Sequence, residues 1–131
     1  MAGGLDEADI FLAKAGESLL GAESELANGR YNNSANRAYY ACFQAAVAAL
    51  IRAGIRPRSL QWGHDFVHAE FAGRLIGRRK LYPPELRETL LLALAARQTG
   101  DYGVKPVTRR EASRVVRSAG ELVQAVTTRR I

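Results

Sequence analysis

Cysteine is almost absent from this sequence, and several other chemical features are missing with it. Cys42 is the only cysteine, which excludes an internal disulfide and any metal site built from several cysteines. No apolar run approaches the roughly 18–20 residues that cross a bilayer. No glycine-rich phosphate-binding loop occurs either. The sequence therefore predicts no metal, no cofactor and no membrane segment.

The totals are those of one globular domain, which we expect over residues 1–131. The chain is 47% hydrophobic and 24% charged, an ordinary balance for a soluble protein. Its first residues are acidic and lack the basic start of a secretion signal, so we expect a cytoplasmic protein. Residues 1–50 carry 3 basic and 6 acidic side chains, whereas residues 51–131 carry 16 and 7. A basic half can attract nucleic acid, nucleotides or an acidic protein, or can simply maintain solubility.

Helical periodicity dominates the chain, and glycine or proline interrupts it between the helices. Five helices are predicted, with approximate ranges 6–28, 34–53, 63–76, 83–97 and 108–126. Residues 99–107 are expected to form a loop. Short connections between five helices predict an all-α fold: an antiparallel helical bundle of four long helices plus a fifth.

Capping residues and small residues refine this prediction. Asp6 is expected to cap the first helix, Asn33 or Ser34 the second, and Thr108 with Glu111 forms a capping box for the last. The second helix should be central, because small residues spaced three or four apart let another helix approach closely. These small residues are Ala38, Cys42, Ala45 and Ala49. The expected apolar anchors of the first and fourth helices are Ile10, Leu12, Leu19, Leu26, Leu86, Leu90, Leu91 and Leu94.

His64 and His68 are four residues apart, a spacing that can place two metal ligands on one face of a helix. The zinc-protease pattern requires glutamate after the first histidine, and Asp65 stands there instead. No third ligand is evident, so we interpret the pair as structural. Cys42 is interpreted as a small buried hydrophobic residue, since it lies in the middle of a helix.

Polar and aromatic residues mark the second helix and the end of the fourth as candidate binding elements. The candidates are Asn36, Arg37, Tyr40, Arg97, Asp101 and Tyr102. A buried Arg37 would need a carboxylate or phosphate partner, and Asp101 is a candidate for an internal polar network between the two helices. The alternative is a phosphate or base site that uses Arg37, Arg97 and Tyr102, because guanidinium groups grip phosphate and tyrosine stacks on bases.

Three motifs of the chain resemble the HEPN (higher eukaryotes and prokaryotes nucleotide-binding) family of bacterial and archaeal proteins. They are the stretch from Tyr31 to Ala46 with its Asn36-Arg37 and Tyr39-Tyr40 pairs, His64-x-x-Val67-x-x-x-Phe71, and Arg97-x-x-x-Asp101-Tyr102. The resemblance covers nearly the whole chain and implies an all-α bundle of four to five helices, commonly a homodimer. It also implies a nucleotidyltransferase protein as partner, possible nucleotide or RNA binding, and a toxin–antitoxin-like pair.

Some HEPN proteins are metal-independent endoribonucleases whose motif is Arg-x(4–6)-His near the end of the penultimate long helix. In this chain Arg97 is followed by Tyr102 where that histidine would stand. A phenol with a pKa of about 10 transfers protons poorly at neutral pH. The substitution therefore favours a binding protein over an enzyme. Arg58 and His64 satisfy the spacing by count, but they precede the third helix, and we interpret the match as chance.

Three functions remain open at this point. The first is a module that binds a nucleotide or RNA, or that pairs with a nucleotidyltransferase. The second is a divergent endoribonuclease toxin in which Arg97 would stabilise charge while Tyr102 or His64 moves protons. The third is a structural bundle that dimerises through the small-residue face of the second helix.

Overall fold

The chain folds into helices joined by short loops. The computed structural model describes residues 6–129, and no strand occurs within that range. The helices are α1 (Glu7–Ala27), α2 (Tyr31–Arg52), α3 (His64–Glu70), α4 (Glu85–Tyr102) and α5 (Arg109–Thr128), and a π-helix, η1 (Phe71–Arg78), continues α3 without a break. None of the helices described has the length and apolar content that crossing a bilayer requires. The prediction of an all-α helical bundle is confirmed.

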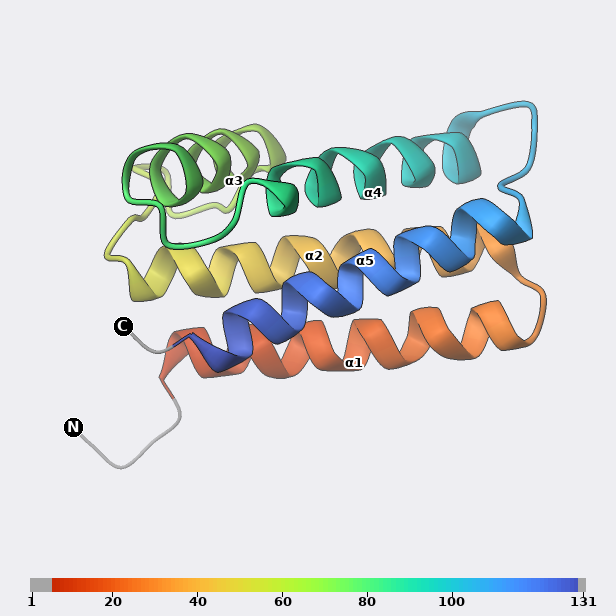
Figure 1. Cartoon of the computed structure of the whole chain (residues 1–131), viewed down its shortest axis with the longest axis horizontal. Coiled ribbons are helices and arrows are strands. Elements are labelled where there is room, and N and C mark those ends of the chain that lie inside the picture. Colours follow the sequence, from red (N-terminus) through yellow and green to blue (C-terminus); the bar gives the residue numbers. More distant parts are fainter. Residues whose placement is uncertain (1–5, 130–131) are drawn as a thin grey trace.

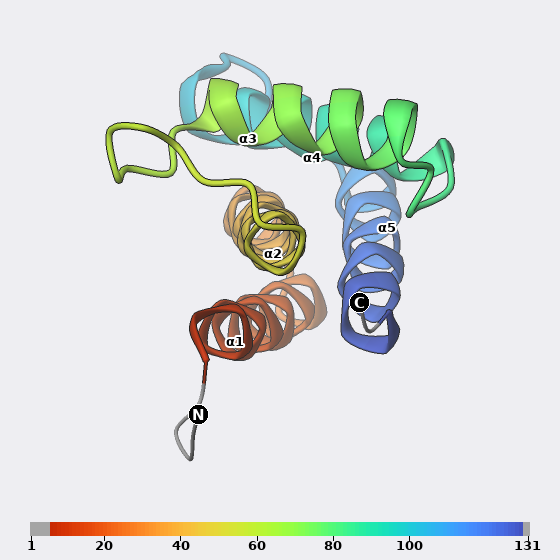
Figure 2. The same ribbon diagram turned by 90° about the vertical axis from the view of Figure 1, so that its left-hand side faces the viewer.

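The long helices α1, α2 and α5 lie side by side, with α4 above them (Figure 1). Each of the four long helices runs opposite to the preceding long helix in the chain. The α3–η1 segment departs from this arrangement: it crosses above α2, roughly at right angles to the helices seen end-on in Figure 2. One side of α2 is therefore covered by α3, η1 and α4, and the opposite side by α1 and α5.

Two of the three predicted N-terminal caps are confirmed. The Asp6 carboxylate accepts the Asp9 amide at 2.8 Å, and Thr108 and Glu111 form the reciprocal capping box of α5. The predicted start of α2 at Ser34 is wrong, because the helix begins at Tyr31 without any side-chain cap. The Ser34 hydroxyl donates instead to the Ala22 carbonyl of α1 at 2.8 Å. This residue therefore joins two helices and does not cap one.

The predicted end of α4 near Arg97 is also wrong, since the helix continues to Tyr102 and only the segment after it forms the loop. Gly100 lies inside the helix, against the start of α2. A Cβ atom at this position would lie 3.2 Å from the Cα of Asn32. The glycine thus permits a close approach between helices, and this role cannot be distinguished from a helix stop in the sequence.

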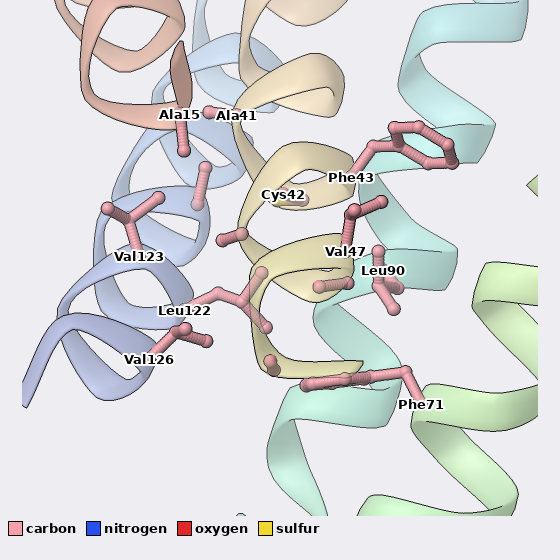
Figure 3. Close-up of a cluster of buried hydrophobic side chains, with 14 of the residues drawn as sticks. Ala15, Ala41, Cys42, Phe43, Val47, Phe71, Leu90, Leu122, Val123 and Val126 are labelled. Atoms are coloured by element: carbon pink, nitrogen blue, oxygen red, sulfur yellow. The ribbon is translucent and has the colours of Figure 1, made fainter. Parts of the chain in front are cut away.

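Helix α2 forms the centre of the core, as predicted. Its small-residue face is completely buried within the chain: Ala38, Cys42, Ala45 and Ala49 are all 0% exposed. In Figure 3, Leu122, Val123 and Val126 of α5 lie on one side of α2, while Phe43 and Val47 point away from them towards α4. Dimerisation through the small-residue face is therefore wrong, because the chain's own helices cover it.

Alanines, and not the expected larger residues, bring α1 against α2. The fully buried apolar positions of α1 are Ala8, Ala15 and Ala22. Ile10 is 42% exposed and Leu91 of α4 is 56% exposed, so these two expected anchors are wrong. Leu86 and Leu90 are buried as predicted. Close packing of small residues leaves the larger side chains of α1 at the edges of the contact.

Candidate functional site

A tyrosine and two histidines meet where α3 crosses α2. Tyr39 is 0% exposed, and its hydroxyl lies 2.5 Å from Nδ1 of His64 and 2.9 Å from Nε2 of His68. A phenol carries one proton, so it donates to one imidazole nitrogen and accepts from the other. Both bonds form when the two neutral imidazoles hold complementary tautomers. The two histidines therefore have a structural role, as predicted, and the buried Tyr39 hydroxyl is their shared partner.

Burial sets the protonation of this trio. It raises the pKa of the Tyr39 phenol far above its usual range, although the nearby Arg97 charge opposes the shift. Burial also lowers the pKa of His64, and Arg97 lowers it further against the smaller pull of Asp65. The pKa of His68 is lowered by burial and by His64. Both imidazoles are consequently neutral at pH 7.

Two arginines contact the aromatic pair at the start of α2. The guanidinium carbon of Arg97 lies 5.3 Å from the centre of the Tyr40 ring and 5.6 Å from that of Tyr39. The guanidinium carbon of Arg37 lies 5.3 Å from the Tyr40 ring. All three distances are within the range of cation–π attraction. The Tyr40 ring therefore makes cation–π contacts with one arginine from its own helix and one from α4.

A chain of polar contacts links the two arginines. Nε of Arg97 donates to Asp101 Oδ2 at 3.1 Å, and Asn36 donates to the same oxygen at 3.1 Å. The Asn36 carbonyl oxygen in turn accepts from Nε and Nη2 of Arg37 at 3.3 and 3.2 Å. A polar network between α2 and the end of α4 is thus confirmed, but the expected pairing of Arg37 with Asp101 is wrong, because Asp101 accepts from Arg97 and Asn36.

The two arginines differ in what remains available to a ligand. Arg97 is paired with Asp101, and its side chain is 18% exposed. Arg37 is exposed on the outer side of α2, so the internal pairing considered for a buried Arg37 does not apply. Among residues 6–129, no carboxylate lies within ion-pair distance of Arg37. The site therefore holds one guanidinium neutralised by a carboxylate, that of Arg97, and one whose charge is free of any carboxylate partner among the described residues, that of Arg37.

A surface groove lies next to the free guanidinium. It has a volume of about 450 Å³ and runs between α1 and α2. Its lining residues are Gly21, Ser24, Glu25, Asn33, Asn36 and Arg37. The one carboxylate among them, Glu25, accepts from Arg30 and Asn33, which offset its charge. The volume lies within the usual range for small-molecule sites.

Five of the six predicted binding residues lie together, and one does not. Tyr102 is 76% exposed, and within the described part of the chain its hydroxyl makes no hydrogen bond. It follows Asp101 in the last turn of α4 but takes no part in the polar contacts. Tyr39 and His68 were not predicted as site residues. Their only signals were the adjacent tyrosines and the spacing of the two histidines, which become meaningful once α3 is placed over α2.

The histidine pair is not part of a larger cluster of potential metal ligands among the described residues. Over residues 6–129, no group of three or more His, Cys, Asp or Glu side chains is arranged to hold a metal ion.

Cys42 is completely buried, and burial raises the pKa of its thiol to about 12. A thiol of this kind is protonated at neutral pH and does not act as a nucleophile.

The fold and the site define a small all-α bundle with an exposed arginine–tyrosine surface at the junction of α2 and α4. The sequence model of the HEPN domain matches residues 8–130. The chain therefore belongs to the HEPN domain family, which associates it with nucleotide- or RNA-related function. Comparison with curated proteins gave no match.

Proposed function

We propose that this HEPN domain binds a nucleotide, free or within RNA, at the surface formed by Arg37, Tyr40 and Arg97. The observation that carries the proposal is the free, exposed Arg37 guanidinium beside a groove of about 450 Å³. Arg97 is already neutralised by Asp101, so Arg37 supplies the charge that an incoming phosphate would meet. Guanidinium groups bind phosphate through two parallel hydrogen bonds.

The aromatic part of the site fits the other half of a nucleotide. Tyr40 is partly exposed, and its ring is held in place by two guanidiniums and by an edge contact with Tyr39 at 5.6 Å. Tyrosine rings and arginine planes both stack on bases. Asn36 offers an amide in the same groove, although its hydrogen bonds to Asp101 and Arg37 fix its orientation. Phosphate and base would thus be recognised by neighbouring residues of one helix.

Binding of fluorescent AMP to the Arg37→Gln protein tests this site. Loss of a charge-assisted contact of about 1.5–3 kcal/mol should weaken binding by about 10- to 150-fold. Arg58→Gln is the matched control, since this arginine is also exposed but lies in the loop after α2. Unchanged affinity in Arg37→Gln, or no binding by the unmodified protein, would refute the proposal.

A specific observation also favours the second function, a metal-independent endoribonuclease. Arg97 and His64 come from different helices, yet both lie against Tyr39. A neutral His64 could accept the 2′-hydroxyl proton. Asp101 binds only Nε of Arg97, so the Nη groups of Arg97 could still donate to the phosphate as its charge develops. This arrangement would replace the histidine missing from the usual motif. It also assigns no role to Tyr102, because that side chain points to solvent.

Cleavage of total RNA in EDTA tests this second function. The expected pattern is cutting by the unmodified protein, loss of at least about 100-fold in His64→Gln and Arg97→Gln, and no change in Tyr102→Phe. Absence of cutting by folded protein at pH 6–8 would leave the binding function alone. Equal cutting by all four proteins would indicate a contaminating nuclease.

The resemblance to stand-alone HEPN proteins supports two further parts of the proposal, a homodimer and a nucleotidyltransferase partner in a toxin–antitoxin-like pair. The chain mass is 14.3 kDa, so light scattering distinguishes a monomer from a dimer directly. Co-expression with a nucleotidyltransferase encoded next to the gene, followed by purification on a tag, tests the pair. Separate elution of the two proteins would contradict it.

A further inference from the structure

A second basic surface lies on α5, on different elements from the proposed nucleotide site. Arg109, Arg110, Arg114 and Arg117 are exposed and, with Ser113, line a shallow groove of about 650 Å³. We call these four arginines the α5 arginine surface. In Figure 2, α1 and α2 lie to the left of α5 and α4 lies above it, and no helix of residues 6–129 lies on its right-hand side.

The charges of this surface are not used inside the molecule. Arg52, Arg56 and Arg74 each pair with a carboxylate. In contrast, none of the arginines of the α5 arginine surface has a carboxylate within ion-pair distance among residues 6–129. The nearest acid along the helix, Glu111, accepts the Thr108 amide at 2.9 Å as part of the capping box. Four free guanidiniums therefore face solvent within a stretch of nine residues.

Three of these arginines form a line along the helix. Arg110, Arg114 and Arg117 are four and three residues apart, so they fall within an arc of about 60° and extend over about 10 Å of helix. Neighbouring phosphates of a nucleic-acid strand repeat on the same scale of several ångströms. Each guanidinium can hold one phosphate through two hydrogen bonds.

The composition of the surface selects among anionic partners. Protein interfaces bury an apolar or aromatic centre, and the groove on α5 is lined by arginine and serine alone. Contacts with a phosphate backbone need no apolar centre, because charge neutralisation and release of counterions supply the affinity. We propose that the α5 arginine surface binds the phosphate backbone of a polynucleotide strand. This inference goes beyond the nucleotide site and does not depend on it.

The test compares the binding of single-stranded RNA and DNA 20-mers of the same sequence to two triple variants. In one variant, Arg110, Arg114 and Arg117 are replaced by Gln, which preserves helix propensity and length. In the control variant, three exposed arginines elsewhere, Arg58, Arg78 and Arg87, are replaced by Gln, so the net charge falls equally. Neutralisation of three to four phosphates predicts that the affinity of the unmodified protein falls about 20- to 50-fold between 50 and 200 mM salt.

The α5 variant should lose most of this salt dependence and bind at least 20-fold more weakly at 50 mM salt, whereas the control variant should stay within about 3-fold. Equal losses in both variants would mean that net charge alone attracts the strand, and would overturn the proposal. Undiminished binding by the α5 variant would also overturn the proposal. Binding of a poly-glutamate peptide as strong as that of RNA would overturn it too, because it would indicate an acidic protein partner. RNA and DNA binding equally identifies the backbone, and a preference for RNA adds the 2′-hydroxyl.

AMP binding separates this inference from the proposed nucleotide site. The α5 variant should bind AMP as the unmodified protein does, and Arg37→Gln should lose AMP binding while it keeps the salt-dependent attachment to a 20-mer. Loss of both ligands in both variants would contradict two separate surfaces. A circular dichroism melt of each variant establishes that the helices are intact.

Discussion

Replacement of Tyr39 by phenylalanine should destabilise the fold, because it removes the hydroxyl shared by His64 and His68. The ring of Tyr39 is completely buried, so phenylalanine fills the same space without a cavity. The change leaves two imidazole nitrogens that lie 2.5 and 2.9 Å from the hydroxyl without their partner. A hydrogen bond of this kind contributes about 0.5–1.5 kcal/mol. The two bonds together predict a loss of about 1–3 kcal/mol in the free energy of unfolding.

Urea and thermal unfolding at pH 7.5 measure this loss. For a chain of 131 residues, about 1–3 kcal/mol corresponds to a fall in Tm of about 4–11 °C. Tyr102→Phe is the matched control, because its exposed hydroxyl has no partner in the described structure, and it should melt as the unmodified protein does. A Tyr39→Phe protein as stable as this control would show that the three side chains do not share hydrogen bonds in solution.

Three other predictions follow from the described contacts. Folding lowers the pKa values of His64 and His68, so the free energy of unfolding should be highest above pH 6.5 and should fall as the pH drops below it. Urea unfolding at pH 7.5 and 5.5 measures this fall, and a variant with both histidines replaced by Gln should lose most of it. Thr108→Ala removes the capping box and should cost about 1 kcal/mol, or about 4 °C in a thermal melt; an unchanged Tm would refute the cap's contribution. Cys42 should not react with a thiol reagent at pH 8 until urea unfolds the chain, since burial raises its pKa to about 12; rapid labelling of native protein would contradict this.

Local rules predicted much of the fold, because periodicity and caps act over a few residues. The capping box at Thr108 and the burial of the small-residue face of α2 followed directly from spacing. The rules failed where a residue serves a distant contact. Ser34 is a possible cap by its residue type but bonds to Ala22 of α1. Gly100 falls in the predicted loop 99–107 but lies within α4, where it permits the close approach to Asn32. Capping and turn residues look the same in sequence whichever task they perform.

The candidate site shows the same limit more strongly. The residues of α2 and the end of α4 were predicted together, because a buried Arg37 would need a carboxylate and Asp101 could supply it. In the structure Asp101 accepts from Arg97 and Asn36 instead. The insertion of His64 and His68 onto Tyr39 could not be predicted, because it depends on how α3 crosses α2. The π-helix that continues α3 was likewise unpredicted, and no local sequence signal for it was recognised.

The crowding around α2 divides this helix into parts with different freedom to change. From Ala45 to Leu50 every position is fully buried, and four of the six are alanines, so almost any larger side chain there would push neighbouring helices apart. The first turns, from Tyr31 to Tyr40, include exposed positions such as Arg37 that can vary without loss of packing. New binding specificity could therefore arise in the first half of the helix while the second half keeps the architecture fixed. In α2, the positions that can change binding are thus separate from the positions that hold the neighbouring helices in place.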